Sequence, residues 1–102
     1  MSGKLGMVHN RPNINKHVGG MIAKACKSAG ISYTVLADML GVYPSTVTRW
    51  VTGYYVPPAY ELYKIAIATE KPMEWFMNGA DPDDIEATRL TIKAYKSGVQ
   101  EI

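Results

Sequence analysis

The sequence predicts an all-α protein, in which five short helices form one domain and an additional helix follows at the C-terminus. Apolar residues recur at three- and four-residue spacings through most of the 102 residues, which is the period of a helix. Glycine and proline interrupt this pattern at intervals typical of short helices. No segment combines two-residue apolar alternation with hairpin turn chemistry, so no strand is expected.

The chain begins with a segment that differs from the rest. Residues 1–15 contain basic side chains but no regular apolar pattern, and we expect them to form a flexible basic arm. A helix at residues 16–29 follows, because apolar residues there return at helical spacing. Gly30 supplies a natural C-terminal stop for this helix.

The next two predicted helices, at residues 33–40 and 44–52, are separated by a tight turn. Ser32 is a suitable N-cap for the first of them. Gly41 ends that helix, because glycine accepts the left-handed conformation that such a turn requires. Pro44 suits the first turn of the second helix, where its missing N–H costs little. This is the layout of a helix-turn-helix, in which one helix enters a DNA major groove while the other braces it.

Three further helices complete the predicted fold. A proline pair at residues 57–58 precedes a helix at 59–68, and a short helix at 73–77 comes next. Residues 81–84 read as the start of the last helix, with acidic side chains at the positive end of its dipole. The predicted domains are therefore the arm at 1–15, the helix-turn-helix domain at 16–79 and the C-terminal helix at 80–102.

The central helix pair meets the steric demands of DNA binding. Ala37 is the small residue needed where the two helices cross, and Val47 and Trp50 direct apolar side chains into the core. The opposite face of the second helix then carries small polar groups and Arg49 but no carboxylate, as a surface facing a polyanion should. A helical hairpin with an ordinary solvated face has a similar pattern. The matched spacing and the flanking helices favour DNA binding.

The outward face of the helix at residues 44–52 supplies the candidate base contacts. An arginine can bind O6 and N7 of guanine in a bidentate manner, and serine and threonine can bond base edges or phosphates. For Arg49, a phosphate contact or an exposed ion pair is the alternative. Near the N-terminus of this helix, side chains should lie deepest in the groove. The predicted base-contacting residues are Pro44, Ser45, Thr46 and Arg49.

Hydroxyl and basic groups around the same helix are expected to bind phosphates, which set register rather than sequence choice. The surrounding tyrosines either donate phenolic hydroxyls to phosphate or pack as lids over the core. Tyr60, Tyr63 and Tyr95 are assigned to packing. The arm either follows the DNA backbone or the minor groove, or remains a tail. The predicted phosphate-contacting residues are Tyr33, Tyr43, Thr48, Tyr54, Tyr55, Arg11 and Lys16.

The last predicted helix carries an apolar seam with alternating three- and four-residue spacings, like a short heptad pattern. The seam either packs on the chain's own fourth or fifth helix or joins two copies as a homodimer. A homodimer would place two modules about 34 Å apart, one helical turn, on a palindromic operator. The predicted dimer interface consists of Ile85, Thr88, Ile92, Tyr95 and Val99.

Composition limits the other function classes. The net charge is +2, with a basic excess in residues 1–56 and an acidic one in 57–102, which fits one face turned toward a polyanion. Cys26 is the only cysteine, and we expect a buried hydrophobe. No nucleophile–base pair, metal-ligand set or phosphate loop occurs, so we expect neither an enzyme nor a metal or other cofactor. Without a bilayer-length apolar run or a signal peptide, the expected location is the cytoplasm of a bacterial host cell, associated with the nucleoid when DNA-bound.

Residues 18–79 resemble the lambda-repressor-like, Cro-type helix-turn-helix family. The matching residues are Leu36-Ala37, Leu40-Gly41-Val42, Ser45-Thr46-Val47, Arg49-Trp50, Gly53, Pro57 and the segment at 72–79. The resemblance implies a five-helix fold that binds double-stranded DNA, and a dimeric transcriptional regulator acting on a palindromic operator. We expect a sequence-specific repressor of phage or prophage type. The alternative is an antitoxin-type protein that also neutralises a protein partner, which would account for the acidic C-terminal half.

Overall fold

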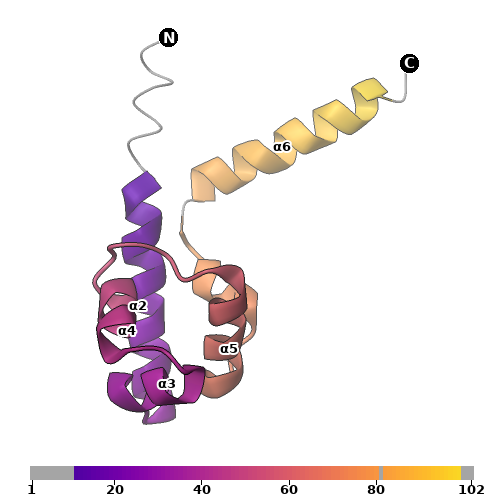
Figure 1. Cartoon of the computed structure of the whole chain (residues 1–102). Coiled ribbons are helices and arrows are strands. Elements are labelled where there is room, and N and C mark those ends of the chain that lie inside the picture. Colours follow the sequence, from indigo (N-terminus) through magenta and orange to yellow (C-terminus); the bar gives the residue numbers. More distant parts are fainter. Residues whose placement is uncertain (1–10, 81, 100–102) are drawn as a thin grey trace.

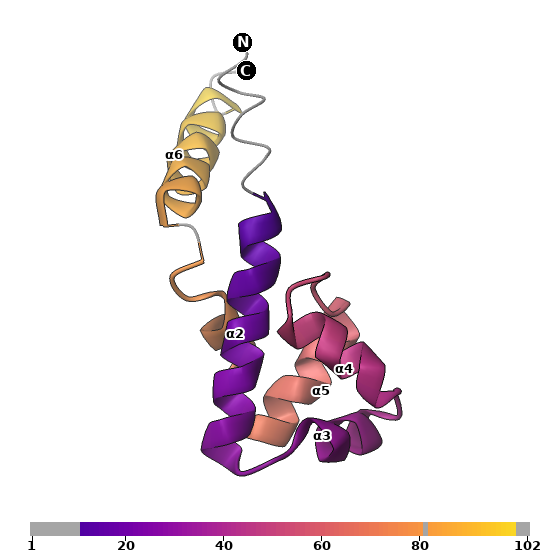
Figure 2. The ribbon, with the colours of Figure 1, turned by 90° about the vertical axis from the view of Figure 1, so that its left-hand side faces the viewer.

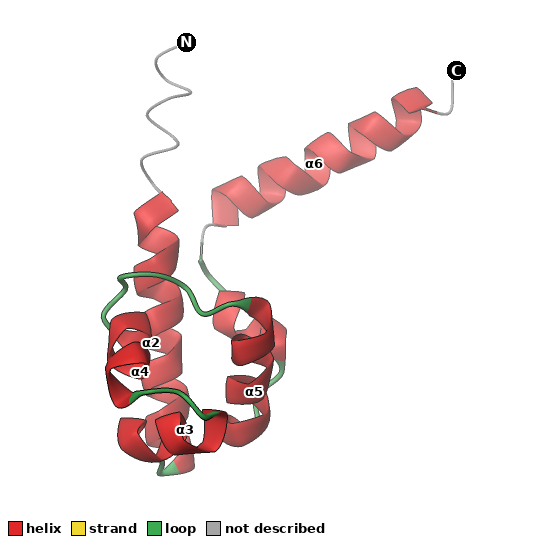
Figure 3. Ribbon diagram, viewed as in Figure 1, coloured by secondary structure: helices red, strands yellow, loops and turns green. Residues whose placement is uncertain are grey.

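A computed structural model shows an all-helical chain, which confirms the predicted fold class (Figures 1 and 3). The structure describes the backbone of residues 11–80 and 82–99, and the side chains of residues 14–80 and 82–98. No strand occurs within these ranges. The elements are α2 (Arg11–Ala29), α3 (Tyr33–Leu40), α4 (Pro44–Val51), α5 (Ala59–Thr69), the 3₁₀ helix η1 (Met73–Met77) and α6 (Pro82–Val99).

The long helix α2 is the centre of the domain. Helices α4 and α5 and the 3₁₀ helix η1 all pack against α2, and α3 packs against α4 and α5. Figure 2 shows α3, α4 and α5 gathered on one side of α2. Burial of apolar side chains from all five elements stabilises this arrangement. The buried core is made of Val18, Ile22, Ala25, Cys26, Leu36, Ala37, Leu40, Val47, Trp50, Leu62, Ile65, Ala66 and Phe76.

Helix α2 begins at Arg11, earlier than the predicted start at Lys16. Tertiary contacts hold this first part of the helix. Ile14 packs against the core, and the Asn15 side-chain amide donates a hydrogen bond of 3.3 Å to the carbonyl oxygen of Tyr54. The predicted arm at residues 1–15 is therefore helical from Arg11, and its residues 1–10 lie outside the described part of the chain.

A backbone-to-backbone contact fixes α2 against the C-terminal end of α4. Gly19 is buried there. A Cβ added to Gly19 would overlap the carbonyl oxygens of Trp50 and Val51 and lie 2.9 Å from the carbonyl carbon of Val51. The two helices can approach so closely only because glycine has no side chain. No apolar period marks this position in the sequence.

Helix α6 does not pack on either of the helices that the sequence offered as partners for its apolar seam. It extends away from the helix cluster in both Figure 1 and Figure 2. Neither α5 nor η1, which are the predicted fourth and fifth helices, packs along it, and apart from Asp84, which is half-buried, its described side chains are exposed. The intrachain alternative for the apolar seam was therefore wrong.

The C-terminus of α5 allows a test of backbone strain. Glu70 occupies the left-handed C-cap position with φ 58° and ψ 44°, and its N–H bonds the carbonyl oxygens of Ala66 and Ile67. This conformation costs an L-residue about 1–2 kcal/mol. Glycine avoids that cost, but its larger entropy loss on folding cancels part of the gain. We expect Glu70→Gly to raise the free energy of unfolding by about 0.5–1 kcal/mol, measured by urea titration. Glu70→Ala keeps the Cβ and should leave stability near the wild-type value; an equal gain in both variants would contradict the strain explanation.

Candidate nucleic-acid interface

The first helix of the motif is capped as the sequence predicts. The backbone N–H of Val35 donates to the Ser32 hydroxyl at 3.1 Å. At the other end, Gly41 adopts φ 73° and ψ 33°. The Val42 N–H then bonds the Ala37 carbonyl at 3.0 Å, which closes the turn. The predicted roles of Ser32 and Gly41 are confirmed.

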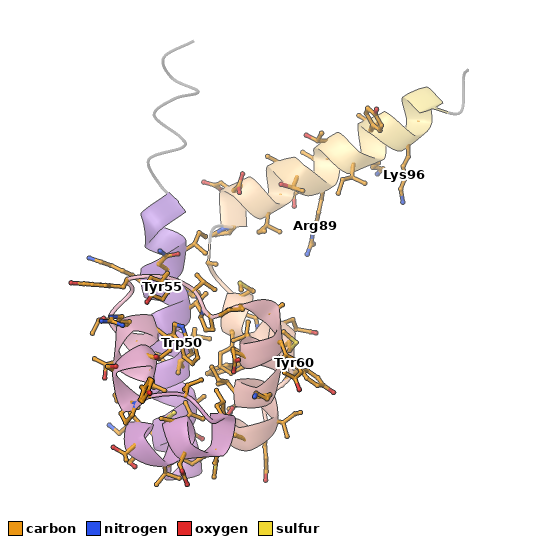
Figure 4. All side chains as sticks on the ribbon, viewed as in Figure 1. Trp50, Tyr55, Tyr60, Arg89 and Lys96 are labelled. Atoms are coloured by element: carbon orange, nitrogen blue, oxygen red, sulfur yellow. The ribbon has the colours of Figure 1, made fainter. Side chains whose placement is uncertain are left out.

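The second helix is anchored by its inner face. Val47 is fully buried and Trp50 nearly so, and Figure 4 shows Trp50 within the helix cluster. Pro44 stands in the first turn of α4, and Tyr43 occupies the N-cap without a side-chain cap bond. Because the inner face is held by the core, the outward side chains of α4 keep a fixed direction.

The outward face of α4 carries most of the side chains predicted to contact bases. Pro44, Ser45 and Arg49 are exposed, and Thr46 is half-buried at the edge of the face. Ser45 and Arg49 are four residues apart, so they lie on the same side of the helix. Among the described residues, no side chain forms an ion pair with Arg49.

Two threonines on this face have hydroxyls that already donate hydrogen bonds. The Thr48 hydroxyl donates to the Pro44 carbonyl at 3.2 Å, and the Thr52 hydroxyl donates to the Thr48 carbonyl at 2.8 Å. Each therefore offers lone pairs and a methyl group to a ligand. Thr52 is exposed and was not among the predicted contacts. Its four-residue spacing from Thr48 was the signal that could have identified it.

The segment after α4 is held close to that helix. Gly53 turns the chain with φ 88°, and the Tyr54 N–H donates to the Arg49 carbonyl at 2.9 Å. The stem of Lys16 packs beneath the turn, because a Cβ on Gly53 would lie 2.8 Å from the Lys16 Cγ. Lys16 is exposed, so the phosphate contact predicted for it is spatially possible. The Arg11 side chain lies outside the described residues.

Exposed tyrosines surround α4. Tyr43 is 79% exposed and Tyr54 is 72% exposed, which rules out core lids at these two positions. Tyr33 and Tyr55 are also exposed, and Figure 4 shows Tyr55 on the outer surface of the loop after α4. All four phenols are accessible to a ligand.

This geometry is that of a helix-turn-helix with an exposed second helix, and comparison with known families agrees. The model of the helix-turn-helix family of lambda-repressor-like, Cro-type domains matches residues 22–76. The chain belongs to this family. No curated protein matches the chain.

Members of the helix-turn-helix family are DNA-binding regulators, and the present chain is a DNA-binding helix-turn-helix protein of transcription regulation. The matched region contains α3, α4 and α5 and ends at Phe76 in η1. Helix α6 lies beyond it. Membership of the family therefore assigns no function to α6.

The structure also tests two predictions about buried side chains, of which the packing of the tyrosines was wrong and the burial of Cys26 is confirmed. Tyr60 and Tyr63, predicted to pack, are exposed by 68% and 52% on the outer face of α5, because Leu62, Ile65 and Ala66 supply the inner face. Tyr95, also predicted to pack, is exposed on α6. Cys26 is buried as predicted, and burial raises the pKa of its thiol.

Neither a membrane span nor a metal cluster is found in the part of the chain that the structure describes. None of these helices combines the length and the apolar content needed to cross a bilayer. No group of three or more histidine, cysteine or acidic side chains is placed there to hold a metal ion.

Proposed function

We propose that this helix-turn-helix protein is a sequence-specific repressor of phage or prophage type, which inserts α4 into the major groove of an operator. The observation that supports this most directly is the outward face of α4. It presents small polar side chains and an arginine that has no ion-pair partner among the described residues, while Val47 and Trp50 on the opposite face fix its orientation. A repressor of this kind acts by occupying a promoter site.

The base contacts would divide by chemistry. Arg49 would bind guanine in a bidentate manner. Ser45 and Thr46 lie in the first turns of α4 and would reach base edges, with Pro44 against a thymine methyl. Thr52, whose hydroxyl proton is engaged, would present acceptor lone pairs and a methyl group to the DNA.

Phosphate contacts would come mainly from hydroxyl groups. The exposed phenols of Tyr33, Tyr43, Tyr54 and Tyr55 can donate to phosphate oxygens, as can the ammonium of Lys16. Thr48 has its hydroxyl proton directed to Pro44, so a phosphate contact there needs the hydroxyl to rotate. Because few cations stand near α4, few counterions would be released, and the salt dependence of binding should be modest.

One module makes few base contacts, so we propose that two copies bind a palindromic operator. Modules about 34 Å apart would meet the same face of the DNA in successive major-groove turns. The homodimer follows from this need for a longer recognised sequence.

The function is tested by fluorescence anisotropy on the DNA that flanks the chain's own gene. Specific binding should be at least about 10³-fold tighter than binding to scrambled DNA of the same composition. In a reporter assay, transcription from the bound promoter should fall when the protein is expressed. Equal affinity for the two DNAs would refute sequence-specific regulation, and increased transcription would refute repression.

A second candidate function is that of an antitoxin-type DNA-binding protein, and the outer face of α5 favours it. Tyr60, Tyr63 and Ile67 are exposed there within two helical turns, and the Lys64 ammonium lies 5.0 Å from the centroid of the Tyr60 ring. Such a face suits a protein partner. Copurification of the full chain with the product of an adjacent gene tests this. Tyr63→Asp should abolish that complex and leave DNA binding intact; no complex with the wild-type chain would refute the candidate.

A further inference from the structure

Helix α6 exposes apolar side chains that the other described elements leave uncovered. Ile85 and Ile92 are 46% and 47% exposed, and Tyr95 is 74% exposed. All three lie within the 18 residues of α6, which extends away from the helix cluster (Figure 1). Most of the stability of a helix in a protein comes from packing of its apolar face rather than from intrinsic propensity. The β-branched residues of α6 lower its helix propensity, so packing against a partner would stabilise it.

The exposed apolar residues form a narrow stripe. Ile85, Thr88, Ile92 and Tyr95 follow each other at spacings of three, four and three residues, which are the a and d positions of two heptads. The side chain of Val99, the next position of this seam, lies outside the described residues. Ile85 and Ile92 occupy a positions, where β-branched side chains are typical of two-stranded parallel coiled coils, while Thr88 and Tyr95 occupy the d positions, where leucine is usual. The stripe therefore matches a second copy of α6.

We propose that α6 pairs with α6 of a second copy as a short parallel coiled coil. Charge complementarity favours this direction. Asp84 precedes the first a position and Arg89 follows the first d position, so they occupy g and e. In a parallel pair, g of one helix faces e of the other. Asp84 of one copy then lies beside Arg89 of the second copy on each side of the seam.

The antiparallel alternative brings like charges together. In an antiparallel pair, a positions pack against d positions and e positions face e positions, so Arg89 lies beside Lys96 of the second copy. Figure 4 shows Arg89 and Lys96 projecting from the same side of α6. Both are exposed. This repulsion disfavours the antiparallel pair, as like charges at such positions do in other coiled coils.

The parallel pair also explains how two recognition helices are joined. This step rests on the proposed function, because only a two-part operator requires two copies of α4. Two heptads give a weak coiled coil, but the operator would hold both copies at high effective concentration. Linked modules gain about 10²–10⁴-fold in affinity over a single one. A full operator should therefore bind far more tightly than a half-site.

The seam is tested with two matched variants of the full chain, Ile92→Glu and Leu90→Glu. Leu90 is 57% exposed and lies at an f position, on the side of α6 away from the seam. Sedimentation equilibrium should show a concentration-dependent dimer for the wild type and for Leu90→Glu, and a monomer for Ile92→Glu. Anisotropy should show Ile92→Glu losing about 10²-fold in affinity for the full operator with half-site affinity unchanged.

The direction of pairing is tested by charge reversal. In a parallel pair, Arg89→Glu places two acidic side chains together and should weaken the dimer several-fold; adding Asp84→Lys should restore it. In an antiparallel pair, Arg89→Glu would meet Lys96 and strengthen the dimer, and that result would overturn the proposed direction.

Two further results separate this inference from the proposed function. A wild-type chain that binds the operator specifically, yet stays monomeric both free and on the full site, would refute α6 pairing alone. A dimer that depends on Ile92 but binds scrambled and operator DNA equally would refute the proposed function and support the pairing. Equal disruption by Leu90→Glu and Ile92→Glu would refute the assignment of the seam.

Discussion

Arg49→Ala should weaken binding to the operator by about 1–3 kcal/mol and relax the preference for one base pair. The effect is expected because Arg49 is the only charged side chain on the outward face of α4. Its guanidinium is exposed and has no ion-pair partner among the described residues. Stability should therefore stay within about 0.5 kcal/mol of wild type, so that a loss of affinity reports on the contact itself. Anisotropy against operators substituted one base pair at a time measures both effects.

Two variants determine how the change in affinity is interpreted. Lys93→Ala removes one positive charge from an exposed position on α6 that lies outside both the seam and the recognition face, and it should leave affinity nearly unchanged. Arg49→Lys keeps the charge but loses the bidentate geometry, so it should recover only part of the affinity. If Arg49→Ala weakened binding uniformly across sequences and lowered the salt slope by about one, Arg49 would contact phosphate instead.

Local rules explain why the helix-turn-helix could be predicted from the sequence. The cap at Ser32 and the left-handed turn at Gly41 depend on residues within one or two turns of each other. The inward direction of Val47 and Trp50 follows from helical period alone. The exposed face of α4 is the one opposite these two residues, so it could be predicted without knowing any contact with other segments. These features are set by short segments, so one sequence is enough to find them.

The features that were missed depend on contacts between distant segments. The early start of α2 reflects the bond from Asn15 to Tyr54, which are far apart in the chain. The exposure of Tyr60 and Tyr63 depends on which face of α5 meets the core, and either face could have seemed apolar. Likewise, the absence of support for α6 could not be inferred from its own periodicity. The contact of Gly19 with α4 left no periodic signal at all.

Gly19→Ala should destabilise the domain by roughly 1–3 kcal/mol, although alanine is the better helix former. The added Cβ meets backbone carbonyls of Trp50 and Val51 rather than a flexible side chain. The Trp50 carbonyl also accepts the Gly53 N–H at 3.1 Å, so α4 can move away only by disturbing its own C-terminal turn. Urea titration measures the loss of stability.

Gly20→Ala is the matched control, because the neighbouring glycine is exposed and a Cβ there meets nothing within 4 Å. It should raise the free energy of unfolding by roughly 0.5–1 kcal/mol, so adjacent substitutions of the same kind should act with opposite sign. Gly19→Ala should also weaken operator binding under conditions where the protein remains folded, since Tyr54, Arg49 and Thr52 all lie near the displaced end of α4. Equal stability changes in the two variants would mean that α2 and α4 do not pack as closely as the structure has them, and would remove the reason to expect an effect on DNA binding.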